Sequence, residues 1–187
     1  MRLATVRLNN EEQTVIIRND EVVLLRHLNE RLNKEYPLSL LPLIETDLLQ
    51  SLKRDCASLQ QEDWDAVQKL SLDEVHFVAP YRNPTHIFGV GMNYVEKAQD
   101  LQATPVDHAP VCFLKPATSL IGMNESIVLP RVSKRVTAEG ELSLIIGKRC
   151  FEVSEEEALD YVIGYTASLD LTASDIHAQN PRFIQMS

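Results

Sequence analysis

Three acidic residues in the last third of the chain, Glu139, Glu141 and Asp170, have the type and spacing of a cation site. Glu139 and Glu141 flank Gly140, and side chains two residues apart on a strand point to the same face. Converging carboxylates repel one another unless a cation neutralises them. An all-oxygen ligand set suits Mg²⁺, Mn²⁺ or Ca²⁺ better than zinc. The alternative is that the two glutamates only form the solvent face of an amphipathic strand.

Two strands must position these carboxylates. Leu142, Leu144 and Ile146 alternate with other residues, which predicts a half-buried strand over 141–146 with the glutamates opposite its apolar face. A second β-like run covers 161–170, and Asp170 ends it. Gly140 has no side chain, so we expect another backbone to approach there. Further short strands are predicted over 86–90, 111–114 and 126–129.

The first 75 residues hold no constellation typical of catalysis, and we interpret them as a structural or oligomerisation domain. Turn-prone Asn9-Asn10 and Asn19-Asp20 separate short β-like runs. One helix is predicted to carry Ile44, Leu48 and Leu52 on one face, and another to carry Trp64, Val67 and Leu70. Six of the nine prolines lie between positions 80 and 130. We therefore predict an α+β protein, with a small α+β domain over 1–80 and a β-rich domain over 84–187.

Charge and composition exclude several classes of partner. The chain has 187 residues, 44% of them hydrophobic, and 18 basic against 27 acidic residues give a net charge of −9. Nucleic acids and anionic membranes need a basic patch, so we expect neither as a partner. The N-terminus lacks the apolar core of a signal peptide. With Cys56, Cys112 and Cys150 taken as reduced thiols, we expect a cytoplasmic protein.

Several motifs together resemble the fumarylacetoacetate hydrolase family over roughly residues 84–187. They are Gly89-Val90-Gly91-Met92-Asn93-Tyr94, Phe113-Leu114-Lys115-Pro116, Ser119-Leu120-Ile121-Gly122, Ile127-Val128-Leu129-Pro130, Glu139-Gly140-Glu141-Leu142, and Gly164-Tyr165-Thr166 followed by Asp170. The resemblance implies a mixed β-roll catalytic domain, incomplete in this chain and often dimeric. Family members continue past the position that matches Ser187. Catalysis is therefore expected of a longer protein, and open strand edges and an exposed apolar face are expected of this segment.

The resemblance also implies a function. Glu139, Glu141 and Asp170 fall on the positions that bind Mg²⁺ or Mn²⁺, while Tyr94 and Lys115 would bind substrate. The expected activity is hydrolysis of a C–C bond in a small 2-oxo or 1,3-diketo acid, such as an acylpyruvate, through a metal-bound enolate. Decarboxylation, isomerisation or hydration of an oxaloacetate-like acid is the second reading. A catalytically silent metabolite-binding homologue is the third.

The departures from the family lie at the acid–base positions. Lys97 stands where the family usually has a histidine, and Asp100 stands where a glutamate partners it. These two residues are neighbours on a helix, and a carboxylate beside an ammonium keeps it protonated. A cationic Lys97 that binds substrate charge is therefore favoured over a Lys97 that removes a proton. His177 replaces a substrate-binding glutamine and could transfer a proton instead, because histidine titrates near neutrality.

Overall fold

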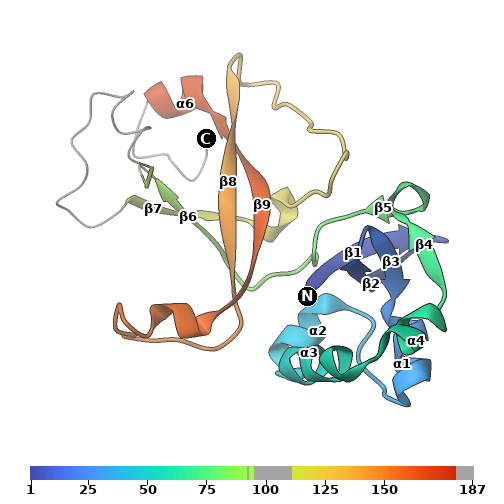
Figure 1. Ribbon diagram of the computed structural model, residues 1–187. Coiled ribbons are helices and arrows are strands. Elements are labelled where there is room, and N and C mark those ends of the chain that lie inside the picture. Colours follow the sequence, from blue (N-terminus) through green and yellow to red (C-terminus); the bar gives the residue numbers. More distant parts are fainter. Residues whose placement is uncertain (92, 95–110, 180–187) are drawn as a thin grey trace. The chain divides into compact units, whose positions relative to one another are not determined.

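The computed structural model describes residues 1–91, 93–94 and 111–179 (Figure 1). The chain divides into two compact units, each built from several segments. Unit 1 comprises Met1–Asn83, Ile121–Ser126 and Leu142–Ala167, and unit 2 comprises Pro84–Leu120, Ile127–Glu141 and Ser168–Ser187. In the described part of the chain, no helix is long and apolar enough to cross a membrane.

Unit 1 contains a five-stranded sheet in the order β4-β3-β2-β1-β5. Its strands are β1 Arg2–Leu8, β2 Glu11–Arg18, β3 Glu21–Leu24, β4 Lys69–Ser71 and β5 His76–Phe77. Each neighbouring pair is antiparallel. The first three strands form consecutive hairpins, as the turn signals predict.

The two hairpin turns follow from side chains that tolerate positive φ. Asn9 and Asn10 have φ of 49° and 67°, and Asn19 and Asp20 have φ of 50° and 61°. Two-residue turns with both φ values positive match the right-handed twist of the flanking strands, and Asn and Asp adopt this conformation at the least cost. The predicted turns are therefore confirmed.

Four short helices complete this part of unit 1: α1 Leu25–Leu32, α2 Leu40–Glu45, α3 Leu48–Ser58 and α4 Gln61–Asp65. The single helix predicted through Ile44 and Leu52 is wrong, because the chain breaks at Asp47, whose φ is 56°. The second predicted helix is also too long, since Leu70 lies on β4.

Both faces of the five-stranded sheet are covered. On one face, Ile16 and Val23 pack against helix residues that include Leu25, Leu43 and Leu52. On the other face, a second cluster contains Val6, Val15, Val22 and Leu24. Alternate residues along one strand enter different clusters, as the period of two requires.

Unit 2 is built around two short sheets. Strand β6 (Ile87–Gly91) pairs antiparallel with β7 (Val111–Lys115), and β8 (Val136–Ile146) pairs with β9 (Val162–Ala173). Helix α6 (Ser174–Gln179) follows β9 directly. Strands β8 and β9 contribute residues to both units. The α+β, β-rich class is confirmed, whereas the strand expected at 126–129 is wrong because that stretch is irregular.

We predict that the apolar side chains of β8 lie on its buried face, but the structure leaves them exposed. Leu142, Leu144 and Ile146 are 57%, 48% and 51% exposed. Among the described residues from Pro84 onward, Ala173 is the one buried hydrophobic side chain. The alternation is therefore correct, but within the described residues the apolar side chains of Leu142, Leu144 and Ile146 are only about half covered.

Candidate metal and substrate site

The two glutamates lie on the more covered face of β8. Glu139 and Glu141 are half-buried, as are their same-face neighbours Thr137 and Ser143. On the other face, Leu142, Leu144 and Ile146 are exposed. A carboxylate face that is better covered than the apolar face is not the ordinary solvent face of an amphipathic strand. In contrast to our expectation, a Cβ added at Gly140 would meet no described atom within 4 Å.

Two backbone hydrogen bonds flank the β8–β9 pair. Near the turn, the Gly147 N–H donates to Tyr161 O at 2.9 Å. At the far end, the Ser174 N–H donates to Arg135 O, also at 2.9 Å. These bonds hold the two ends of the hairpin together.

The lining of a nearby hollow indicates which face of β9 carries Asp170. Val136 of β8 lines a hollow of about 150 Å³ together with Leu171 and Ala173 of β9, so these three side chains share a face. Alternation then places Asp170 on the opposite face, which is the face of the hairpin that carries Glu139 and Glu141.

Asp170 is paired with a lysine from another strand. Lys115 Nζ, at the end of β7, lies 2.7 Å from Asp170 Oδ1, and both side chains are about three-quarters covered. The same ammonium donates a hydrogen bond to Leu171 O at 2.8 Å. Asp170 Oδ1 is buried and accepts no hydrogen bond of normal geometry within the described residues. The contact is therefore an ion pair in a site largely screened from water.

An aromatic ring supports the lysine. Lys115 Nζ lies 5.4 Å from the centre of the Phe113 ring. Phe113 pairs with Gly89 across the β6–β7 ladder, and a Cβ added at Gly89 would come within 2.2 Å of the ring. The ring therefore occupies the space that a side chain would need, which explains the glycine in this motif.

Two further predicted site residues, Tyr94 and His177, lie outside strands β7, β8 and β9. Tyr94 lies just after β6 and is 42% exposed. His177 lies on α6, and its Nδ1 is buried without a hydrogen-bond partner in the described part of the chain. Lys97 and Asp100, which we predict to be neighbours on a helix, lie outside the described residues.

Asp175 has a structural role that the sequence analysis does not predict. Its carboxylate accepts hydrogen bonds from Ser133 Oγ at 2.6 Å and from the Lys134 N–H at 2.8 Å. The Lys134 N–H and then the Ser133 hydroxyl hold the pKa of this carboxyl below its usual range. Asp175 thus ties the loop before β8 to the first turn of α6. The one available signal was the acid at the start of a helix.

The donor set partly fits a divalent cation. Three carboxylates on one face of a hairpin match the oxygen ligands that Mg²⁺ and Mn²⁺ prefer, and the buried Asp170 Oδ1 already faces a cation, Lys115 Nζ. Among residues 1–91, 93–94 and 111–179, however, no three His, Cys, Asp or Glu side chains already come together as a metal-binding group. The chemistry of the residues fits a metal, and Lys115 supplies the positive charge beside Asp170.

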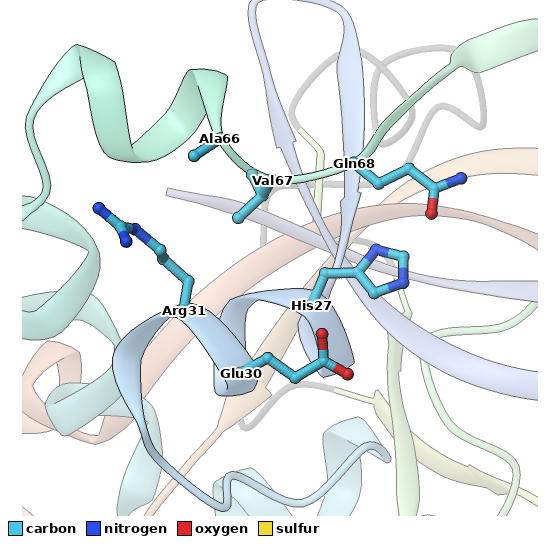
Figure 2. A pocket seen from close by; sticks show the side chains of 6 residues that line it. All are labelled: His27, Glu30, Arg31, Ala66, Val67 and Gln68. Carbon is cyan, nitrogen blue, oxygen red and sulfur yellow. The ribbon is translucent and has the colours of Figure 1, made fainter.

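A separate hollow lies in unit 1, on α1 and the stretch after α4 (Figure 2). It has a volume of about 480 Å³ and is lined in part by His27, Arg31 and Gln68. Figure 2 shows Arg31 directed away from His27. Arg31 is an ion-pair partner of Asp63. This open hollow contains none of the motif residues.

Comparison with known proteins decides the family. The model of the fumarylacetoacetate (FAA) hydrolase C-terminal domain matches residues 86–187, more than half of the chain. The chain belongs to the fumarylacetoacetate hydrolase family. Its substitutions at the family's acid–base positions are consistent with a divergent member.

Relatives from archaea and animals share this region. An uncharacterised protein of Pyrococcus abyssi is 51% identical over 96 residues, covering 51% of this chain and 42% of the relative. A mitochondrial oxaloacetate tautomerase of Xenopus laevis is 40% identical over 106 residues, covering 57% of this chain and 33% of the relative. The chain thus spans well under half the length of these curated relatives.

Solved structures share the fold over almost the whole chain. A fumarylacetoacetate hydrolase from Exiguobacterium antarcticum has a TM-score of 0.74 at 23% identity, covering 99% of this chain and 62% of that one. A maleylpyruvate hydrolase from Sphingobium, solved with manganese(II) and pyruvate, has a TM-score of 0.69 at 26% identity. It covers 92% of this chain and 59% of that one.

Proposed function

We propose that the complete protein is a divalent-cation-dependent enzyme acting on a small 2-oxo or 1,3-diketo acid, with hydrolytic cleavage of a C–C bond as its reaction. The proposal is supported by Glu139 and Glu141 sharing the half-buried face of β8, and by Asp170 of β9 pairing with Lys115 in a site largely screened from water. Further support comes from the family relative solved with manganese(II) and pyruvate, a 2-oxo acid.

Each residue has a proposed role. Glu139, Glu141 and Asp170 would hold Mg²⁺ or Mn²⁺, and Ca²⁺ also suits their oxygen atoms. A bound divalent ion would supply positive charge for the oxygens of the substrate. Lys115 has three N–H donors; one is used by Leu171 O and a second faces Asp170 Oδ1, so one remains for a substrate carboxylate. Tyr94 is exposed enough to reach a ligand.

Proton transfer needs a further group. Lys97 with Asp100 and His177 are the proposed candidates, and Lys97 serves better as a cation than as a base. His177 is the stronger candidate for moving a proton, because its Nδ1 has no described partner to fix its tautomer. We also propose that the protein forms a homodimer and acts in the cytoplasm.

A second activity is favoured by sequence identity. The oxaloacetate tautomerases of Xenopus laevis and Homo sapiens are 40% and 38% identical to this chain over 106 residues. Tautomerisation of oxaloacetate moves a proton without cleaving a C–C bond, so it needs no water attack on a carbonyl. That proton transfer still needs an acid–base group, for which His177 is the proposed candidate.

The test is a turnover assay on the full-length protein. Acetylpyruvate and oxaloacetate are each supplied with Mn²⁺ or with EDTA, and cleavage, decarboxylation and enol–keto conversion are followed separately. Metal-dependent cleavage that disappears in Glu141→Gln and persists in the exposed control Glu156→Gln supports the hydrolase. Tautomerisation alone would support the second activity. Metal and oxalate binding with no turnover of either acid would identify a silent homologue.

A further inference from the structure

The environment of Lys115 fixes its ammonium from three directions. It faces Asp170 Oδ1 at 2.7 Å, donates to Leu171 O at 2.8 Å and lies 5.4 Å from the centre of the Phe113 ring. Leu171 O belongs to the backbone of β9, so this anchor does not move when a side chain turns. The Phe113 ring in turn fills the space above Gly89. The ammonium is therefore held independently of Asp170.

Asp170 uses only one of its two carboxylate oxygens in this contact. Oδ1 is buried and faces Lys115. The carboxylate lies on the face of the hairpin that also carries Glu139 and Glu141. A carboxylate with one oxygen bound to a fixed cation loses rotational freedom. Its other oxygen remains available to bind a second cation.

We infer that Lys115 is a positioning residue for the metal site: it holds Asp170 through Oδ1 so that Oδ2 can ligate the divalent cation. This inference rests on the proposed function, because it takes Asp170 as a metal ligand. Groups that orient a ligand from behind contribute about 10- to 100-fold to metal affinity when removed singly.

The opposite arrangement has the opposite consequence. If Lys115 were only a counter-ion that fills the empty site, an incoming cation would have to displace it from Asp170. Removing Lys115 would then strengthen metal binding, because the competitor would be gone and three carboxylates would repel one another without it. The sign of the change in affinity separates the two arrangements.

The experiment is Mn²⁺ titration of the full-length protein by isothermal calorimetry. Four variants are compared with the wild type: Lys115→Met, Lys115→Arg, Lys53→Met and Glu141→Gln. Lys115→Met keeps the side-chain stem over Phe113 and removes the charge, whereas Lys53→Met removes an exposed lysine of α3. We expect about 10- to 100-fold weaker Mn²⁺ binding in Lys115→Met. Lys115→Arg keeps a donor and a charge, so its loss should be smaller.

Urea unfolding in EDTA accompanies each titration. A purely structural role for Lys115 would lower the unfolding midpoint of the metal-free protein and leave the Mn²⁺ affinity of the folded fraction unchanged. That outcome overturns the inference, as does equal or tighter Mn²⁺ binding by Lys115→Met. Weak binding by Glu141→Gln beside tight wild-type binding upholds the metal site on its own. A wild type that binds no Mn²⁺ overturns the proposed function and the inference with it.

Discussion

Arg82 forms an ion pair with Glu125, 43 residues further along the chain, with Nη2 at 3.1 Å from Oε1. The same guanidinium pairs with Glu12 of β2 at 2.8 Å. Glu125 also accepts a hydrogen bond from the Gly122 N–H at 2.7 Å. This network joins the segment 121–126 to the five-stranded sheet of unit 1.

Acid should destabilise unit 1 through this network. The Arg82 guanidinium, and then the Gly122 N–H, lower the pKa of Glu125 to about 2 from its ordinary value of 4.5. A carboxyl with a lower pKa in the folded state stabilises the fold fully above its unfolded pKa and loses that contribution as pH falls toward the folded one. We therefore expect the urea midpoint to fall between pH 4.5 and pH 2.

Arg82→Met tests the cause of that loss. Without the guanidinium the urea midpoint should already be lower at pH 7, and it should change less between pH 4.5 and pH 2. The exposed Arg2 of β1 provides a control, since Arg2→Met should retain the wild-type pH dependence. An Arg82→Met profile parallel to the wild type would show that the network does not link pH to stability.

Gly89 and Gly91 form a matched pair on β6. A Cβ at Gly89 would lie 2.2 Å from a Phe113 ring atom, whereas a Cβ at Gly91 would meet Val111 Cβ at an ordinary 3.6 Å. Gly89→Ala should therefore destabilise the protein by about 1–3 kcal/mol, as overpacking does, while Gly91→Ala should stay within about 0.5 kcal/mol of the wild type. Chemical denaturation measures both.

Combining Gly89→Ala with Phe113→Leu identifies the clash. If the Phe113 ring is the obstacle, the double variant should lose less stability than the sum of the two single variants. Strict additivity would mean that the ring is not what excludes a side chain at Gly89.

Cys56 should be unreactive in the folded protein. Burial, and then the neighbouring Asp55, raise the pKa of its thiol to about 11. The thiolate is the reactive form, so very little of it exists at pH 8. Cys150 lies exposed in the turn between β8 and β9. Alkylation with iodoacetamide at pH 8, read by mass spectrometry, should label Cys150 first and Cys56 only after unfolding. Equal labelling rates in the native protein would contradict this.

Local signals predicted local structure well. The pairs Asn9-Asn10 and Asn19-Asp20 tolerate positive φ, so the turns between the first three strands could be predicted without tertiary information. The break at Asp47 could not, because the apolar spacing continues across it. The hydrophobic pattern indicates which residues share a face of a helix. It does not indicate where tertiary packing interrupts the helix, as it does at Asp47.

The candidate site was also predicted only in part, because spacing rules reveal neighbours along a strand but not contacts between distant segments. Alternation along β8 correctly put Glu139 and Glu141 on one face, and the family motifs pointed to Asp170. The pairing of Lys115 with Asp170 joins residues far apart in the chain, so no spacing rule could reveal it.

The most direct test of the central claim is thermal melting of the full-length protein in EDTA, with Mn²⁺, and with Mn²⁺ plus oxalate. A ligand that binds only the folded state raises the melting temperature, and oxalate presents the same chelating oxygens as a 2-oxo acid. The proposal of a metal-dependent enzyme for 2-oxo acids predicts one rise with Mn²⁺ and a further rise with oxalate, both absent in Glu141→Gln. Melting temperatures equal in all three conditions would contradict it.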